Sequence, residues 1–471
     1  MCKDRLMPDR LSALDASFLY VEDQTTPMHV GGVAIFERPP SGFTYEQMLD
    51  LVGARLAFLP RYRQRVLNVP GHLARPVWVD DVDFDLNYHV RRSALPQPGS
   101  DDQLFDLVAR LMSRRLAPER PLWEAYFVEG LAGDRVAMVT KTHQSVVDGV
   151  GTIDLGQLIL DETPEPPEPF EDLWVPRREP SRAQLVLDAM SETVQRPGEL
   201  IENVRSIAGD AVTTVSKAVE TLGGVAATIT RPAPPGPLNV RVSGGRVFSV
   251  VRTRLEDFRK IRADHGGTVN DVILAAITGA LREWLLSRGE NLTPTETVRA
   301  LVPMAVTDAE TAEFATPALV GNQVAAYLLD LPVGEPSPVL RLQHLGHAMA
   351  EHVNSGRSVA ARGLLKVSGF APATLHSLGA RAGGSLSGRI FNLMITNSPG
   401  PQVPVYAGEA RLVEMFPVMP LMRTQALAIG VTSYHGGVYF GLNGDRKAAF
   451  DVGLLGGMIE EALEELKGAH W

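Results

Sequence analysis

The sequence predicts an α/β (α+β) protein of two domains joined by a helical linker. The 471 residues are too many for one ordinary hydrophobic core and suit two domains of usual size. Two proline-rich stretches, 163–169 and 231–237, interrupt the chain, and strand-like and helix-like segments occur on both sides of them. We therefore expect an N-terminal domain over 1–162, a linker over 163–237 and a C-terminal domain over 238–471.

The linker is bounded by these two stretches, which read TPEPPEP and RPAPPGP. Proline fixes φ and removes an N–H donor, so neither a helix nor a central strand continues through them. Between them, residues 181–230 carry apolar side chains at helical spacing, and Pro197-Gly198 divides the segment into two helices. The mixed charges of this segment favour a connector on the surface over an amphipathic segment seated on a membrane.

In the N-terminal domain, two predicted strands lead into a polar loop. Strand-like patterns cover Trp123–Glu129 and Arg135–Thr142, and Gly133-Asp134 joins them as a hairpin. Residues 143–149 follow, and then a helix is expected over Ile153–Leu160. The polar loop therefore lies on a strand-to-helix connection, where functional residues are often found.

The C-terminal domain is predicted to mix strands and helices in the same way. A strand is expected at Val247–Arg252, and a helix at Asn270–Leu286 begins after the capping residue Thr268. A final helix covers Val452–Leu466. Further strands are expected at Asn322–Leu329, Phe391–Asn397, Ala426–Tyr434 and Val438–Leu442.

Composition and charge limit the classes of function. The chain is 45% hydrophobic and 21% charged, and it lacks an apolar stretch near the roughly 18 residues that span a bilayer. The N-terminal residues lack the apolar region of a secretory signal, so we expect a cytoplasmic protein. The single cysteine, Cys2, argues against a disulfide framework and a thiolate metal site. The formal net charge of −10 argues against broad attraction to nucleic acid, so an acidic ligand needs a local pocket.

The polar loop belongs to the segment Lys141–Gly149, which reads KTHQSVVDG. This segment resembles the His-His-x-x-x-Asp-Gly signature of the wax ester synthase/diacylglycerol acyltransferase family, with Gln144 in place of the second histidine. Other family-like segments follow in the expected order along nearly the whole chain: Leu14–Phe18, Pro27–Gly32, Arg61–Arg65, Asp83–Val90, Pro121–Glu124, Asn270-Asp271, Gly321–Val324, Asn397–Pro401 and Phe440–Asp445.

The resemblance implies two chloramphenicol-acetyltransferase-like (CoA-dependent acyltransferase) domains with the reaction centre in a tunnel between them. It implies an acyl-CoA-dependent O-acyltransferase, with diacylglycerol ahead of a long-chain fatty alcohol as acceptor and triacylglycerol or wax ester as product. Acyl-CoA is then a substrate, and no permanently bound cofactor is expected. The protein is expected to visit the inner membrane or lipid inclusions peripherally and to bind no nucleic acid.

Acyl transfer from a thioester to an alcohol needs a base, and histidine suits this role because its pKa lies near neutral pH. The family assigns the base to the second histidine of the signature and uses the aspartate, here Asp148, to anchor the loop. Gln144 can donate a hydrogen bond but cannot accept a proton. The candidate catalytic residues are therefore His143, Gln144 and Asp148. His143 is the remaining base of the motif if a local turn directs it to the site, and a histidine that braces the loop is the alternative.

The resemblance also suggests residues for substrate binding, namely Gly149, Pro121, Leu122, Trp123, Asn270 and Asp271. By residue type alone, Asp148-Gly149 and Asn270-Asp271 are helix caps, and Pro121–Trp123 begins a buried strand. The resemblance adds contact with the acyl chain for Pro121–Trp123 and a tunnel-lining position for Asn270-Asp271. Three histidines, 344, 347 and 352, provide one possible pair without a third ligand, so no metal is expected.

Two other functions stay open. A catalytically impaired paralogue that binds acyl-CoA or neutral lipid without turnover is motivated by Gln144. A peptide-synthetase-like condensation domain belongs to the same superfamily, but the motifs along this chain resemble the lipid family more.

Overall fold

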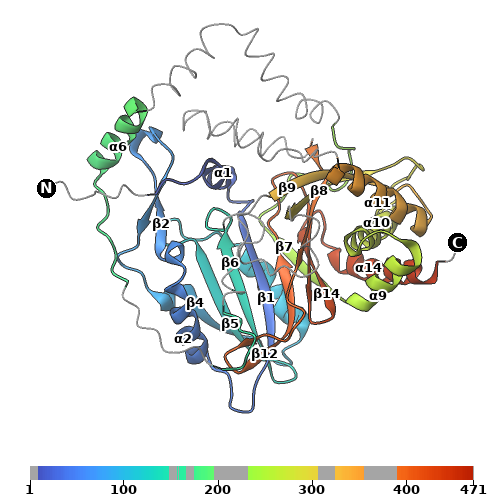
Figure 1. The fold of residues 1–471 in the computed structure, drawn as a ribbon, viewed down its shortest axis with the longest axis horizontal. Coiled ribbons are helices and arrows are strands. Elements are labelled where there is room, and N and C mark those ends of the chain that lie inside the picture. The colour runs from blue at the N-terminus through green and yellow to red at the C-terminus, as the bar shows by residue number, and fades with distance from the viewer. Residues whose placement is uncertain are drawn as a thin grey trace, which may run out of the picture.

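A computed structural model describes residues 9–147, 156, 159–165, 174–195, 232–305, 324–354 and 390–469. Two six-stranded sheets stand side by side, each accompanied by helices (Figure 1). The predicted mixed α/β architecture is therefore confirmed. Within the described ranges, no helix has the length and apolar character needed to cross a membrane.

The first sheet has the order β11-β12-β1-β6-β5-β4, and only the pair β4–β5 is parallel. Its strands are β1 (His29–Glu37), β4 (Val90–Ala94), β5 (Trp123–Leu131), β6 (Arg135–His143), β11 (Tyr406–Ala407) and β12 (Ala410–Val418). A separate hairpin pairs β2 (Gln64–Leu67) with β3 (Val77–Asp80). Shorter elements are α1 (Ala13–Val21), η1 (Pro60–Arg63), η2 (Pro70–His72) and α3 (Leu86–His89).

Helices pack on both faces of the first sheet because neighbouring strand residues alternate between the faces. Met138 of β6 lies in a core shared with α2 (Tyr45–Leu56), whereas Val139 lies in a core shared with α4 (Asp101–Met112). Both faces are therefore buried, and polar side chains on β6 must find partners inside the protein.

The second sheet has the order β7-β14-β13-β10-β8-β9, and β10 pairs in parallel with β13 and β8. Its strands are β7 (Arg246–Arg254), β8 (Val298–Ala305), β9 (Val324–Leu331), β10 (Leu393–Pro399), β13 (Leu427–Tyr434) and β14 (Gly437–Asp445). Its helices are α9 (Leu255–His265), α10 (Val269–Ser287), α11 (Pro338–Asn354) and α14 (Val452–Gly468).

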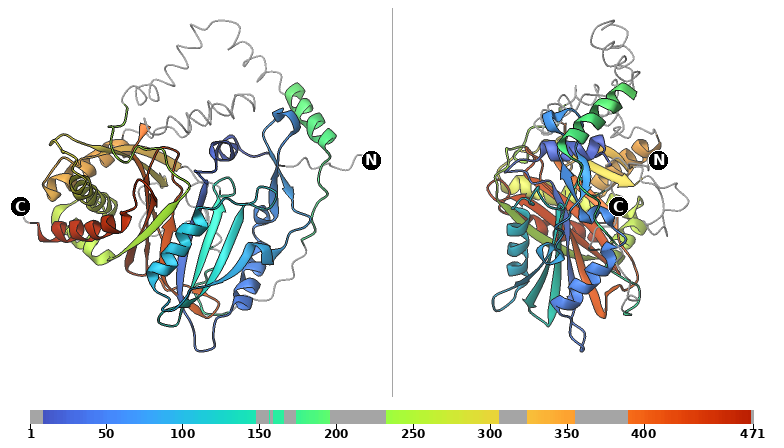
Figure 2. Two further views of the ribbon diagram at one scale, coloured as in Figure 1. Left: turned by 180° about the vertical axis from the view of Figure 1, so that it is seen from behind. Right: turned by 90° about the vertical axis from the view of Figure 1, so that its left-hand side faces the viewer.

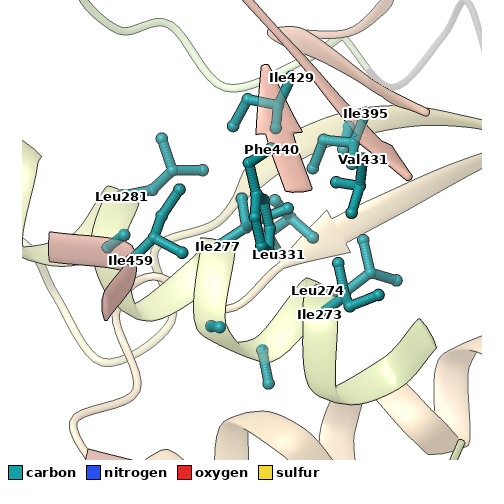
Figure 3. Packing of buried hydrophobic residues seen from close by; sticks show 14 of the residues in the cluster. Ile273, Leu274, Ile277, Leu281, Leu331, Ile395, Ile429, Val431, Phe440 and Ile459 are labelled. Carbon is teal, nitrogen blue, oxygen red and sulfur yellow. The ribbon is translucent and has the colours of Figure 1, made fainter. Parts of the chain in front are cut away.

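These four helices lie on the side of the second sheet that faces away from the first sheet (Figure 2). The core between them and the sheet is apolar, as Figure 3 shows for Ile277 of α10, Ile459 of α14 and Phe440 of β14. We call each sheet with its helices one half of the protein. The opposite face of the second sheet is turned toward the first half, where Phe248 of β7 joins the core beneath α4. The two halves therefore share buried apolar surface.

Two strands cross from one half to the other. β11 and β12 follow β10 of the second sheet in the chain, yet they pair into the first sheet, where β12 lies beside β1. The chain then returns to the second sheet at β13. The domain bounds expected from the proline-rich stretches stay a prediction, and this exchange shows that the two sheets do not divide at one point of the chain.

The predicted elements agree with the structure at most described positions. β5, β6, β7, β9, β10, β13, β14, α10 and α14 all overlap the ranges expected from the sequence. The first linker helix is α6 (Arg182–Gln195), whose buried Leu185 and Ala189 pack against the β2–β3 hairpin. The second linker helix and most of the predicted helix Ile153–Leu160 lie outside the described residues.

Candidate functional site

The end of β6 brings two histidines together. In the antiparallel pair β1–β6, His29 lies directly opposite His143. The N–H of His143 donates to the carbonyl of Leu122 at 2.9 Å, and the N–H of Gln144 donates to the carbonyl of Met28 at 2.9 Å. The backbone around His143 is therefore held by β5 on one side and by the start of β1 on the other.

A carboxylate lies beside both imidazoles. Glu22, which follows α1, places Oε1 3.5 Å from His29 Nε2 and 3.9 Å from His143 Nε2. Its other oxygen, Oε2, accepts a hydrogen bond from Arg115 Nη2 at 2.7 Å. His29 and His143 are both buried, and their ring centroids are 6.1 Å apart. The three side chains form a buried acid–histidine–histidine cluster, called the Glu22 cluster below.

Burial sets the protonation states in the Glu22 cluster. It lowers the pKa of His143 to about 3 and the pKa of His29 to about 4, because a charged imidazole loses its hydration there. Burial raises the pKa of Glu22, but the neighbouring His29 and Arg115 side chains outweigh this effect and lower it to about 2. At neutral pH the cluster therefore holds an ionised carboxylate and two neutral imidazoles.

The tautomer of His143 follows from its neighbour Ser145. The backbone N–H of Ser145 donates to His143 Nδ1 at 3.0 Å, and the Ser145 hydroxyl lies 2.7 Å from the same nitrogen. Because a backbone N–H can only donate, Nδ1 is the acceptor and the proton of the neutral ring is on Nε2. The lone pair of His143 is therefore already occupied by a hydrogen bond.

Gln144 begins the turn after β6, in which the N–H of Val146 donates to the carbonyl of His143 at 2.9 Å. A turn thus follows His143 directly, and the catalytic role of His143, for which a local turn was the condition, stays a prediction. The side-chain oxygen of Gln144 is buried and has no hydrogen-bond partner among the described residues. Asp148 and Gly149, the remaining predicted site residues of the motif, lie outside the described residues.

The predicted segment Pro121–Trp123 lies at the start of β5, and all three residues are buried. Leu122 supports His143 through its carbonyl, as described above. Trp123 donates from Nε1 to the carbonyl of Tyr62 at 2.7 Å and stacks on His89 at 4.6 Å between ring centroids. These contacts place Trp123 in the core, and contact with an acyl chain stays a prediction.

The predicted pair Asn270-Asp271 lies in the first turn of α10. Asp271 is buried; its Oδ2 accepts a hydrogen bond from the N–H of Thr268 at 2.8 Å, and its own N–H donates to the Thr268 hydroxyl oxygen at 3.1 Å, which forms a capping box. Asn270 accepts a hydrogen bond from Asn397 at 3.1 Å. This bond joins two family-like segments, while the proposed substrate contact stays a prediction.

Sequence reasoning missed a second buried polar group on the same face of the sheet. Lys141 Nζ lies 3.7 Å from Glu124, which also binds Arg91 at 3.0 Å and accepts a hydrogen bond from the Tyr126 hydroxyl at 2.6 Å. Burial lowers the pKa of Lys141 to about 8. The sequence signal was the position of Lys141 two residues before His143 on the strand.

A small cavity lies between the two halves of the protein. It has a volume of about 10 Å³ and is lined by residues of β1, α4, β7, β12 and β14, among them His29, Arg246 and Asn443. This volume holds about one water molecule. In the described ranges no three His, Cys, Asp or Glu side chains gather as they would around a metal ion.

Comparison with known proteins supports the family resemblance seen in the sequence, and the similarity covers both halves of the chain. The wax ester synthase/diacylglycerol acyltransferase catalytic domain matches residues 11–273, and the WS/DGAT C-terminal domain matches residues 320–467. The probable diacylglycerol O-acyltransferase tgs2 of Mycobacterium tuberculosis is 33% identical over 99% of each chain. The probable diacylglycerol O-acyltransferase tgs3 of the same organism is 49% identical over 55% of this chain and 96% of its own.

Solved structures extend this similarity to the fold. The wax ester synthase/diacylglycerol acyltransferase of Marinobacter aquaeolei VT8 superimposes with a TM-score of 0.67 at 28% identity, over 97% of this chain and 98% of its own. The first condensation domain of the calcium-dependent antibiotic synthetase has a TM-score of 0.59 at 14% identity, over 98% and 97% of the two chains, which shows a shared fold alone. The matches over both halves establish that this chain belongs to the wax ester synthase/diacylglycerol acyltransferase family.

Proposed function

We propose that the protein transfers a fatty acyl group from acyl-CoA to the hydroxyl of diacylglycerol or of a long-chain alcohol. The observation that carries this proposal is the buried pair of neutral imidazoles at the end of β6, where the family signature falls. Relatives over the full length are named as diacylglycerol O-acyltransferases, which favours diacylglycerol as the acceptor. Acyl-CoA is a substrate in this proposal, and no resident cofactor is required.

The reaction needs a proton acceptor that is neutral at working pH and shielded from water. The acceptor hydroxyl attacks the thioester carbonyl carbon, its proton moves to a base, and the carbon–sulfur bond breaks to release coenzyme A. Neutral buried imidazoles supply such a base, and the ionised Glu22 stabilises the imidazolium that forms. Exclusion of water limits hydrolysis of the thioester in competition with the alcohol.

The experiment is an acyl-transfer assay with the purified full-length chain. Labelled palmitoyl-CoA is offered with diacylglycerol or with hexadecanol, and neutral lipid and free thiol are followed together. Equal amounts of ester and thiol are the expected result. Thiol release without ester indicates hydrolysis and contradicts the proposal.

A second candidate function is favoured by the motif itself. Gln144 cannot take a proton, and the lone pair of His143 is engaged by Ser145. A protein that binds acyl-CoA or neutral lipid without turnover would keep the fold and lack a base. Stoichiometric binding of palmitoyl-CoA with no ester product from either acceptor would support this function over transfer.

We also infer that the protein is cytoplasmic and meets its lipid substrates at the surface of the membrane or of lipid inclusions. Leu187 and Met190 of α6 are largely exposed, and so is Leu73 beside the neighbouring turn η2. Exposed apolar side chains of this kind favour contact with a lipid surface. Flotation with diacylglycerol-containing vesicles tests the inference, and recovery of all protein in the lipid-free fraction would contradict it.

A further inference from the structure

We propose that His29, which lies outside the family signature, accepts the proton of the acceptor hydroxyl and that Glu22 is its positioning residue. This inference rests on the proposed acyl transfer and names the residue that performs its proton-transfer step. Three observations carry it: the engaged lone pair of His143, the unpartnered Nδ1 of His29, and the position of His29 at the cavity between the halves.

The first observation removes the obvious candidate. His143 accepts the backbone N–H of Ser145 at Nδ1, so a proton can reach that nitrogen only after this hydrogen bond breaks. Its other nitrogen, Nε2, carries the ring proton and lies on the side of Glu22. His143 is therefore arranged to hold the turn after β6 in place.

The second observation concerns the hydrogen-bonding capacity of His29. Both ring nitrogens are buried; Nε2 faces Glu22, whereas Nδ1 has no hydrogen-bond partner in the part of the chain that the structure describes. An unpartnered buried polar atom is costly, so its presence in a native protein calls for an explanation. Glu22 lies 3.5 Å from Nε2, close enough to favour the tautomer with its proton on Nε2. The lone pair is then on Nδ1, where none of the described residues occupies it.

The third observation is the position of His29 beside a cavity that suits a substrate hydroxyl. His29 lines the cavity between the two halves, together with the polar side chains of Arg246 and Asn443. The cavity volume of about 10 Å³ suits a single water or hydroxyl oxygen. His143 does not line this cavity.

The proposed step balances without a further reactant. The hydroxyl proton passes to the unprotonated nitrogen of His29 while the oxygen bonds to the thioester carbonyl carbon. The carbon–sulfur bond then breaks, the thiolate takes the proton from the imidazolium, and His29 returns to its neutral form. Glu22 is ionised throughout and stabilises the transient positive charge, as a carboxylate does for a catalytic histidine.

The experiment compares His29→Asn with His89→Asn in the full chain. His89 is a matched control because it is buried in the same half and does not line the cavity. Its Nδ1 lies 2.8 Å from the carbonyl of Trp123, within hydrogen-bond distance. We expect His29→Asn to lower kcat by about 10²- to 10⁴-fold, the usual contribution of positioned proton transfer, with little change in KM or in the Kd for palmitoyl-CoA. His89→Asn should keep most of its kcat per acyl-CoA-binding molecule.

Two further variants separate a chemical role of His29 from a structural one. Gln144→His returns a base to the signature, so His29→Asn should cost far less kcat in that background than in the natural one. Glu22→Gln should lower kcat alone but add little to His29→Asn, because a positioning residue acts through its partner. If His29→Asn binds acyl-CoA substoichiometrically, His29→Gln replaces it.

The outcomes are distinct. The assignment of His29 is overturned if His29→Asn has the same kcat as the natural chain. It is also overturned if His29→Asn loses the same factor in kcat with and without Gln144→His. In both cases the proposed function stands. Absence of ester formation by the natural chain with every acceptor overturns the proposed function and this assignment together.

Discussion

Gly31 and Gly32 are neighbours on β1, yet the structure predicts opposite consequences for a methyl group at the two positions. A Cβ at Gly31 would lie 2.0 Å from the carbonyl oxygen of Thr140, on the backbone of β6. A Cβ at Gly32 would lie 3.6 Å from its nearest atom, the carbonyl oxygen of Phe416, which is ordinary contact. The two substitutions, Gly31→Ala and Gly32→Ala, therefore form a matched pair.

The magnitude follows from the distances. Backbone atoms cannot rotate away, so β1 and β6 must separate by at least about 1 Å at Gly31 to bring the contact above 3.0 Å. Overpacking of this kind costs about 1–3 kcal/mol, and each ladder hydrogen bond that is lost adds about 0.5–1.5 kcal/mol. Gly32→Ala should instead be neutral or stabilise the strand by roughly 0.5–1 kcal/mol, because alanine loses less backbone entropy on folding.

The assay is chemical unfolding of the two variants and the natural chain, followed by circular dichroism, together with kcat on the same preparations. We expect Gly31→Ala to be less stable than Gly32→Ala by about 3 kcal/mol or more, from the overpacking and hydrogen-bond costs above. Its kcat should also fall, because Gly31 is two residues from His29 on the strand that holds the Glu22 cluster together. Equal stability of the two variants would refute the β1–β6 register described above.

Three more predictions concern the site and the seam between the halves. In the His29→Asn background, Gln144→His should raise kcat by up to roughly 10²- to 10⁴-fold by returning a base to the signature; an unchanged rate would contradict this. Phe416→Ala, on β12 beneath α4, should lower the free energy of unfolding by about 3–5 kcal/mol, whereas Phe450→Ala, at a 69% exposed side chain, should change it little. The pKa of Lys141 falls from 10.5 in the unfolded chain to about 8 in the folded one. Between these pH values the unfolded state binds one more proton than the folded state. The free energy of unfolding should therefore rise with pH by up to about 3 kcal/mol relative to that of Lys141→Met. Parallel plots of unfolding free energy against pH for the two proteins would contradict the burial of the Lys141 ammonium group.

Most of the second half could be predicted because its local patterns agree with its structure. Helix α10, for example, is predicted by the apolar run that follows the capping residue Thr268. β12 could not be predicted in the same way, because Pro417 interrupts its pattern and proline argues against an inner strand. The structure tolerates Pro417 because β11 pairs only with the first residues of β12, so no described strand on that side needs the missing N–H.

The candidate site was predictable only in part. The signature directed attention to His143 and Gln144, and both lie where β6 ends. Glu22 and His29 reach the same place through the pairing of β1 with β6, which joins residues more than a hundred positions apart. Such long-range pairing depends on the whole sheet, and no local pattern around Glu22 reports it.

The crossing of β12 also has a consequence for how the protein is made. β1 leaves the ribosome early, but its partner β12 is synthesised roughly 380 residues later. At about 5–20 residues per second, this edge of the first sheet waits on the order of 20–80 s with unpaired N–H and C=O groups. The first sheet therefore cannot mature while the chain emerges, and a fragment cut at either proline-rich stretch would expose an aggregation-prone strand edge. Co-expression of the missing fragment should restore solubility, which makes the two halves partners in folding as well as in the reaction.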